Sequence, residues 1–317
     1  MSERRQRIWA PVIILIVLVL LWEALVTAFE IQQFLLPKPS AIVGNLVQVV
    51  VIDATAQAGE TGAARETSVG SRFLVFLTSA LSSDEQAAFE EALLFRIPLG
   101  GRSVSVLRGA NLSPILAASW FTLKEALGGL ALGTLTAIAV ALATTRWAAS
   151  REALLPFAIA ANSMPIIAFA PIMNNWFGID NPFSKMAIVT IMIFFPIMIN
   201  TVRGLISVDH RSLELMHSYA ASDAEILLKL RIPNALPSLF SGLKVAGALA
   251  MIGAIVGEYF GGPRIALGVF ITQEAALFRF ASAWAAILVA CLLGIALYLI
   301  ILTAERLAMP WHQTFRP

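Results

Sequence analysis

The side chains that could do chemistry are few, and most lie within or beside long apolar runs. No Gly-x-x-x-x-Gly-Lys-Ser/Thr loop occurs, and the glycine-rich stretch 128–133 has no lysine after it, so the sequence predicts no ATP hydrolysis by this chain. We interpret His210, His217 and His312 as solvated or interfacial side chains. The single cysteine, Cys291, excludes an intramolecular disulfide and a cysteine-based metal site. We therefore expect no catalytic residue, metal or cofactor in this chain.

Polar groups inside the apolar runs form a second class, because such groups are costly in lipid and often functional. Asparagines offer uncharged hydrogen bonds, and prolines free backbone carbonyls that need partners in protein or in a wet cavity. If the apolar runs cross a membrane, the residues that could line a pathway through it are Asn162, Pro165, Pro171, Asn174, Asn175, Asn200 and Glu258. We expect an irregular stretch between the two prolines and consider a gate role for the glutamate; interhelical bonding is the alternative role for the asparagines.

The most informative stretch runs from Val208 to Pro237. Ser212–Tyr219 suits one short helix, and Ser222 and Glu225 have the spacing of a capping box at the start of a second. Glu225 is also followed at i+4 by a lysine, a pair of the favourable polarity on a helix. The sequence therefore predicts two short amphipathic helices between two apolar segments.

The second of these helices presents one apolar face, made of Ile226, Leu227 and Leu230, and Pro233 is expected to end it. Such a face could lie on lipid, pack on its own bundle, or insert into a groove of a partner protein. The residues alone leave these three possibilities open.

The elements that position these residues are membrane spans. Of 317 residues, 58% are hydrophobic and 13% charged, and the mean hydropathy is +0.81; soluble domains carry about a quarter charged residues. Apolar runs of about twenty residues cross a hydrocarbon core. The six predicted spans are Trp9–Phe29, Leu127–Thr145, Leu154–Phe177, Phe183–Ile206, Leu236–Phe260 and Ala281–Thr303. We therefore expect an all-α polytopic membrane protein with six transmembrane helices. The net charge of +2 gives no reason to invoke nucleic acid.

The distribution of lysine and arginine predicts the orientation, because positive loops stay cytoplasmic. With the N-terminus inside, the inside segments hold 12 of the 22 Lys and Arg residues, and five of the other ten lie in one long loop. Long loops translocate largely regardless of charge. Both termini are therefore expected in the cytoplasm, and the long loop outside it.

The sequence suggests four parts. Residues 1–52 hold the first span and an amphipathic connection, 53–113 form an extracytoplasmic insertion, 114–310 form a core with five spans and the loop 208–237, and 311–317 are a cytoplasmic tail. Within the insertion, Thr55–Gly70 is expected to be flexible. A short helix is predicted at Ser82–Phe95, and a strand at Ser103–Leu107.

The loop 208–237 resembles a known motif. Glu214-Leu215-Met216, then Ala220, then Leu230-x-Ile232-Pro233 resemble the EAA loop of permease subunits in binding-protein-dependent ABC importers, whose pattern is Glu-Ala-Ala, three residues, Gly, nine residues, Ile-x-Leu-Pro. The spacing matches throughout, whereas leucine and methionine replace the two alanines and Ala220 replaces the glycine. A longer stretch carries further motifs: Pro165-Ile-Ile-Ala-Phe-Ala-Pro171, Asn175-Trp-Phe-Gly178, Phe195-Pro196 and Asn200-Thr201. With these, the chain from about Trp120 to Arg306 resembles the subfamily that serves nitrate, sulfonates, taurine, the pyrimidine precursor of thiamine, and riboflavin.

The resemblance implies a type I importer permease without enzymatic activity, in a bacterial or archaeal cytoplasmic membrane. Its implied partners are a second permease copy, two ATP-binding cassette subunits that use ATP and Mg²⁺, and an extracytoplasmic substrate-binding protein. The implied coupling residues are Glu214, Ala220, Ser222, Glu225, Ile226, Leu227, Leu230, Ile232 and Pro233. The alternatives are an ion-coupled secondary transporter and a membrane-anchored receptor that acts through the loop 53–113. Because the span interiors offer mainly Asn, Ser, Met and Phe, a neutral or aromatic heterocycle is favoured as substrate.

Overall fold

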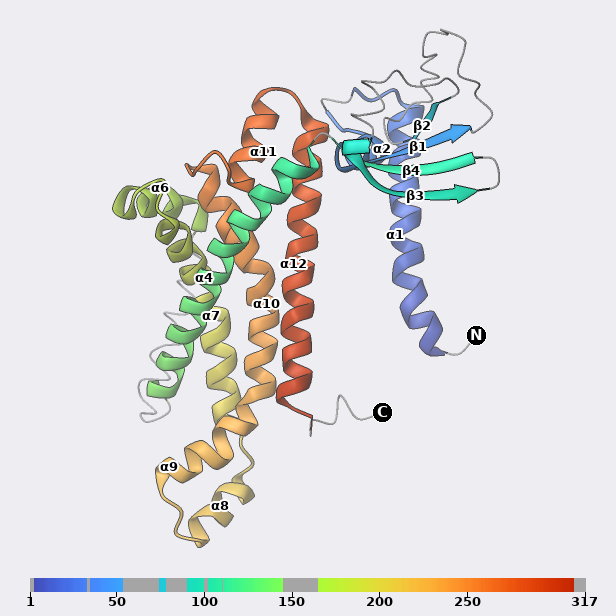
Figure 1. The fold of residues 1–317 in the computed structure, drawn as a ribbon. Helices are drawn as coiled ribbons and strands as arrows, with labels where there is room; N and C mark the ends of the chain where they lie inside the picture. Colours follow the sequence, from blue (N-terminus) through green and yellow to red (C-terminus); the bar gives the residue numbers. More distant parts are fainter. Residues whose placement is uncertain are drawn as a thin grey trace. The chain divides into compact units, whose positions relative to one another are not determined.

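Figure 1 shows the fold in a computed structural model, which describes residues 3–32, 35–53, 74–77, 90–99, 102–109, 111–144 and 165–310. The chain divides into two compact units. Unit 1 comprises Met1–Ala117 with Phe270–Leu288, and unit 2 comprises Ala118–Val269 with Val289–Pro317. The predicted flexible stretch Thr55–Gly70 lies outside the described residues.

Unit 1 begins with the apolar helix α1 (Glu3–Ala28) and the short helix α2 (Pro39–Leu46). The carboxylate of Glu23 in α1 accepts hydrogen bonds from the backbone N–H of Ser40, at 3.0 Å, and from its hydroxyl, at 2.8 Å. The first N–H groups of a helix lack partners within the helix. Glu23 therefore supplies one such partner at the start of α2, which accounts for a charged residue near the end of an apolar helix.

A four-stranded sheet follows, with the order β2-β1-β4-β3. Its strands are β1 (Val47–Asp53), β2 (Leu74–Leu77), β3 (Leu93–Leu99) and β4 (Arg102–Arg108). β1 pairs with β2 in parallel, whereas β4 pairs antiparallel with both β1 and β3. The mostly helical chain therefore contains a mixed sheet, which the all-α expectation does not include.

The sheet confirms one prediction for the insertion and corrects another. The strand predicted at Ser103–Leu107 is confirmed, since it lies within β4. The helix predicted at Ser82–Phe95 is present at residues 90–92 but wrong at its end, because residues 93–95 belong to β3, where pairing with β4 prevails over the local capping signal; residues 82–89 lie outside the described part. The expected boundary between residues 52 and 53 falls inside β1.

After the sheet, the described helices of ten or more residues are α4 (Leu112–Thr144), α6 (Ile166–Phe177), α7 (Pro182–Ile206), α10 (Ile232–Tyr259), α11 (Leu267–Ala276) and α12 (Phe280–Ala308). All of them except α11 overlap a predicted span. Within the described residues, four helical segments are long and apolar enough to cross a membrane: Leu112–Thr144, Pro182–Ile206, Asp223–Tyr259 and Phe280–Ala308. The chain is therefore a multi-pass membrane protein, and the full set of six spans stays a prediction.

Helix α7 is the centre of unit 2, with α4 and α10 beside it (Figure 1). Glycines allow both close approaches. A Cβ at Gly129 of α4 would lie 2.5 Å from the Cβ of Val189 in α7, and a Cβ at Gly257 of α10 would lie 2.9 Å from Ile188. Val189 and Ile188 are buried in these contacts. Gly129 and Gly257 therefore lie at packing seams, as small residues usually do between membrane helices.

Candidate functional site

Two short helices lie between α7 and α10. The segment Glu214–Pro233, which we call the coupling segment after the motif that it resembles, runs from within the first of them to the start of α10. The first, α8 (His210–Ser218), ends in a Schellman motif: the N–H of Ala220 donates to the carbonyl of His217 at 2.9 Å, and that of Ala221 to the carbonyl of Met216 at 3.0 Å. Ala220 has a φ of 52°, the left-handed conformation that favours glycine. The chain therefore makes the sharp turn at the position where the motif has glycine, although the residue is alanine.

The second helix, α9 (Asp223–Ile226), starts with the predicted capping box. The Ser222 hydroxyl accepts from the backbone N–H of Glu225, and the Glu225 carboxylate accepts from the backbone N–H of Ser222. The predicted pair is also confirmed, with the ammonium of Lys229 2.8 Å from Glu225 Oε1. The hydrogen bond from Lys229, followed by those from Ser222, lowers the pKa of Glu225 to about 2.

Pro233 does not end this helix, contrary to the prediction. α9 continues through a π-helical turn, η1 (Leu227–Arg231), into α10, and the Ile232 N–H donates to the Leu227 carbonyl five residues earlier. A proline ring clashes with the carbonyl four residues before it in an α-helix. A wider π turn just before Pro233 is one way to avoid that clash, so α9, η1 and α10 form one continuous rod.

The apolar face predicted for docking is largely turned inward. Ile226 is 4% exposed, and Leu227 is half-buried against the hydrophobic core of unit 2; Leu230 is also half-buried. Leu227 therefore packs the coupling segment on its own bundle, which was the self-packing alternative. The apolar side chains that it leaves exposed are those of Leu215 (56%), Leu228 (64%) and Tyr219 (77%).

Glu214 remains accessible in α8. Its carboxylate lies 3.2 Å from Nδ1 of His210, one helical turn earlier, and both side chains are largely exposed. An exposed pair of this kind contributes little to stability. Glu214 is therefore free to contact a partner as well as to pair within α8.

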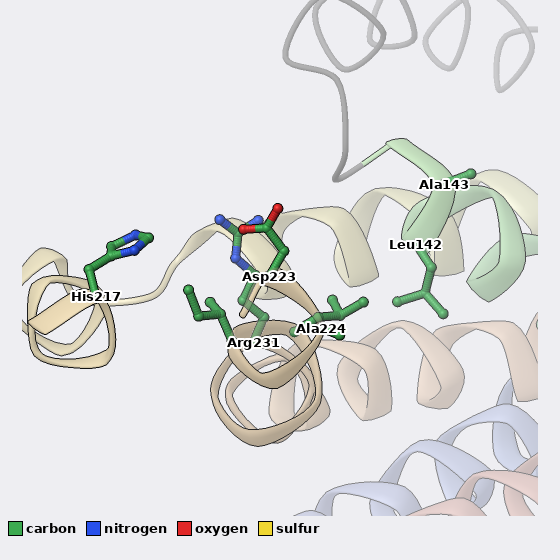
Figure 2. A pocket seen from close by; sticks show the side chains of 8 residues that line it. Leu142, Ala143, His217, Asp223, Ala224 and Arg231 are labelled. Atoms are coloured by element: carbon green, nitrogen blue, oxygen red, sulfur yellow. The ribbon is translucent and has the colours of Figure 1, made fainter. Parts of the chain in front are cut away.

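A hollow of about 600 Å³ lies between the C-terminal end of α4 and the coupling segment. Figure 2 shows Leu142 and Ala143 of α4 on one side, and Asp223 and Arg231 on the other. His217 of α8 also lines it. The hollow beside the coupling segment is therefore lined by both charged and apolar side chains.

The pathway candidates on α6 are divided between two faces. Residues 166–177 form one helix with Pro171 inside it, so the irregular stretch expected between the two prolines is wrong. Pro171 removes a single donor, which this helix tolerates. Pro165, Pro171 and Asn175 are exposed. Asn174 is buried and donates to the carbonyls of Gly257 and Gly261, at 3.3 and 3.4 Å.

The other candidates are held within the bundle or lie beyond the described part. The side-chain amide of Asn200 donates to the Pro196 carbonyl of its own helix at 2.7 Å. Glu258 is buried beside Glu125 of α4 and Lys185 of α7. Asn162 falls outside the described residues. The sequence reasoning missed Glu125 and Lys185, although a charged residue in an apolar helix was the available signal.

Comparisons with known proteins agree with the features described above. Residues 129–307, more than half of the chain, match the family described as "Binding-protein-dependent transport system inner membrane component". The chain is 35% identical over 185 residues to a formylaminopyrimidine transport permease protein of Halalkalibacterium halodurans, covering 58% of this chain and 73% of that one.

Two further relatives carry other names. The chain is 34% identical to a riboflavin transport system permease protein of Chloroflexus aurantiacus, over 53% of this chain and 62% of the relative. It is 28% identical to the taurine transport system permease protein of Escherichia coli, over 47% of this chain and 54% of that one. The chain therefore belongs to the family of binding-protein-dependent transport system inner membrane components, the permeases of ABC importers.

Proposed function

We propose that this chain is the permease subunit of an ATP-driven importer for a small organic solute. Two copies would line the translocation pathway, two ATP-binding cassette subunits would hydrolyse ATP with Mg²⁺, and an extracytoplasmic binding protein would deliver the solute. Both termini would lie in the cytoplasm. Family membership supports this assembly, and the coupling segment is the observation that carries it.

The coupling segment suits a lever that projects beyond the membrane. The rod from Asp223 to Tyr259 has 37 residues, which gives a length of about 55 Å at 1.5 Å per residue. A hydrocarbon core is about 30 Å thick. The polar start of the rod, with its capping box, would therefore extend into water on the side of α8.

The exposed apolar side chains of this lever indicate where the ATPase subunit would dock. Leu215, Tyr219 and Leu228 lie beside charged groups such as Glu214 and Lys229. Apolar anchors surrounded by charge are typical of protein interfaces. Meanwhile Leu227 packs the lever against the core of unit 2, so a push on the exposed side would be transmitted to the bundle.

A neutral or aromatic heterocycle is the proposed substrate class. The relatives named for formylaminopyrimidine and riboflavin match this chain over 185 and 169 residues, whereas the one named for taurine and one of those named for aliphatic sulfonates match it over 149 and 96 residues. On α6, the exposed polar side chain among the pathway candidates is the uncharged Asn175. Neither observation requires the solute to be an anion.

The test is reconstitution in proteoliposomes with the ATPase subunits and the substrate-binding protein. We expect ATP-dependent uptake of a pyrimidine or flavin and stimulation of ATP hydrolysis by the loaded binding protein. Uptake of a sulfonate instead would contradict the substrate class alone. Uptake driven by an ion gradient without ATP, or no association with an ATPase, would contradict the importer assignment and favour the secondary transporter.

A further inference from the structure

Three ionisable side chains meet in the interior of unit 2, away from the coupling segment. They are Glu125 of α4, Lys185 of α7 and Glu258 of α10, and they are 2%, 0% and 1% exposed. We call them the buried triad. Charged groups in membrane helices are expensive unless their charges are compensated. The burial of the triad therefore raises the question of which of its side chains carry a proton.

Glu258 has the contacts of an ionised carboxylate. Its Oε1 accepts from the hydroxyl of Thr122 at 2.7 Å, and its Oε2 accepts from the backbone N–H of Gly268 at 2.6 Å. The Thr122 hydroxyl in turn accepts from the N–H of Leu267, the first residue of α11. Both oxygens of Glu258 thus accept a hydrogen bond. Its negative charge also lies at the start of α11, where it is favourable.

Residue 268 must be small for these contacts to form. A Cβ built on Gly268 would lie 2.7 Å from the carbonyl oxygen of Ile255 and 2.9 Å from Oε2 of Glu258. Distances this short force either the backbone or the carboxylate to move. The glycine thus brings the N–H groups of α11 against Glu258.

Glu125 has the opposite surroundings. Within the described part of the chain, no N–H or O–H group donates to either of its buried oxygens. Its carboxyl nevertheless interacts with the carboxyl of Glu258. Two ionised carboxylates only accept hydrogen bonds, whereas a protonated one also donates. The contact is therefore favourable only with a proton on one of them.

The charges of the neighbouring groups also indicate one proton on the two glutamates. Lys185 attracts both glutamates, and its ammonium donates to the carbonyl of Ile179. With both glutamates ionised the triad would carry one net negative charge, and with one proton it is neutral. Asp180, which also attracts Lys185, lies on the exposed loop before α7; Tyr259 adjoins Glu258 on α10.

We propose that the buried triad is a proton-binding site: Glu125 holds one proton and donates it to the ionised Glu258, and Lys185 makes the group neutral. In this state the triad joins α4, α7, α10 and the start of α11. This goes beyond the proposed function, because it concerns a bound proton rather than the solute or the ATPase.

Infrared spectroscopy of the purified full-length chain tests the proposal, because a protonated carboxyl has its own C=O stretching band. We expect this band at pH 7 in the unmodified protein and its loss in Glu125→Gln, whose amide keeps a hydrogen-bond donor towards Glu258. Glu305→Gln is the matched control: Glu305 is another buried glutamate, but it is paired with Lys244 at 2.8 Å, so the band should remain.

A second variant examines the charge count. In Lys185→Met the ammonium is lost, so neutrality requires a proton on each glutamate, and the band should grow about twofold. An unmodified protein without the band, a band that survives Glu125→Gln, or an unchanged band in a folded Lys185→Met protein would overturn the proposal.

Discussion

Ala220 shows how one residue can be at odds with the turn that it occupies. The Schellman motif at the end of α8 places it at a φ of 52°, where the Cβ of an L-residue approaches the following carbonyl and costs about 1 kcal/mol or more. The turn is nevertheless made, since two backbone hydrogen bonds and the capping box that follows hold it from both sides. The coupling segment thus stores local strain at its hinge.

Ala220→Gly should relieve this strain. We expect the variant to be about 1 kcal/mol more stable and to transport normally, because no side-chain contact is lost. Thermal unfolding of the detergent-purified protein measures the gain. Ala221→Gly, one residue later and outside the left-handed region, is the matched control and should not be stabilised; a lower melting temperature for Ala220→Gly would contradict the strain.

Among the helices, the glycine seams decide how closely α4 and α10 approach α7. At Gly129 a Cβ would meet the backbone oxygen of Met186 at 2.8 Å as well as the Val189 side chain, and a backbone atom does not yield easily. Gly294 of α12 is the contrast, since a Cβ there meets nothing within 4 Å among the described residues.

Gly129→Ala should therefore destabilise the protein by about 1–3 kcal/mol through overpacking. Gly294→Ala should be neutral or stabilise the protein by up to about 1 kcal/mol, because alanine favours a helix. The melting temperatures of the two variants in the same detergent make the comparison. Equal effects would show that the seam at α7 does not limit the packing.

The local elements that the sequence predicted best have strong local signals. Ser222 and Glu225 specify a capping box, and the apolar runs of α7, α10 and α12 end within a few residues of their predicted limits. The predictions that were wrong concern residues whose structure depends on partners distant in the sequence. Leu93–Phe95 became a strand through pairing with β4, and Leu227 turned inward because it packs against the core of unit 2.

The buried triad illustrates the same limit for the candidate site. Glu258 was singled out for its place at the end of an apolar run, but its partners come from positions 133 and 73 residues earlier, Glu125 and Lys185. A single sequence does not show that three helices bring them together. The two predictions based on proline were also wrong, because one missing donor neither ended the helix at Pro233 nor interrupted α6 at Pro171.

For the whole molecule, the charge distribution predicts that the sheet-containing insertion and the coupling segment lie on opposite sides of the membrane. In a Cys291→Ala background, a cysteine at exposed Glu91 should react with a membrane-impermeant thiol reagent in intact cells. A cysteine at exposed Ser218 should react only after permeabilisation. The reverse pattern would invert the topology.

The central claim is that the exposed side of the coupling segment docks an ATPase subunit, and Leu228→Asp tests it most directly. Leu228 is exposed in this chain, so the change should leave the fold intact, and its loss from an interface removes about 1.5–3 kcal/mol of burial, or tenfold or more in affinity. The measurement is the amount of ATPase subunit that co-purifies with the permease, together with ATP-dependent uptake. Leu277→Asp changes a similarly exposed leucine after α11; it is the control and should retain the ATPase. The account predicts loss of both the ATPase and uptake in Leu228→Asp; full co-purification with normal uptake would contradict it.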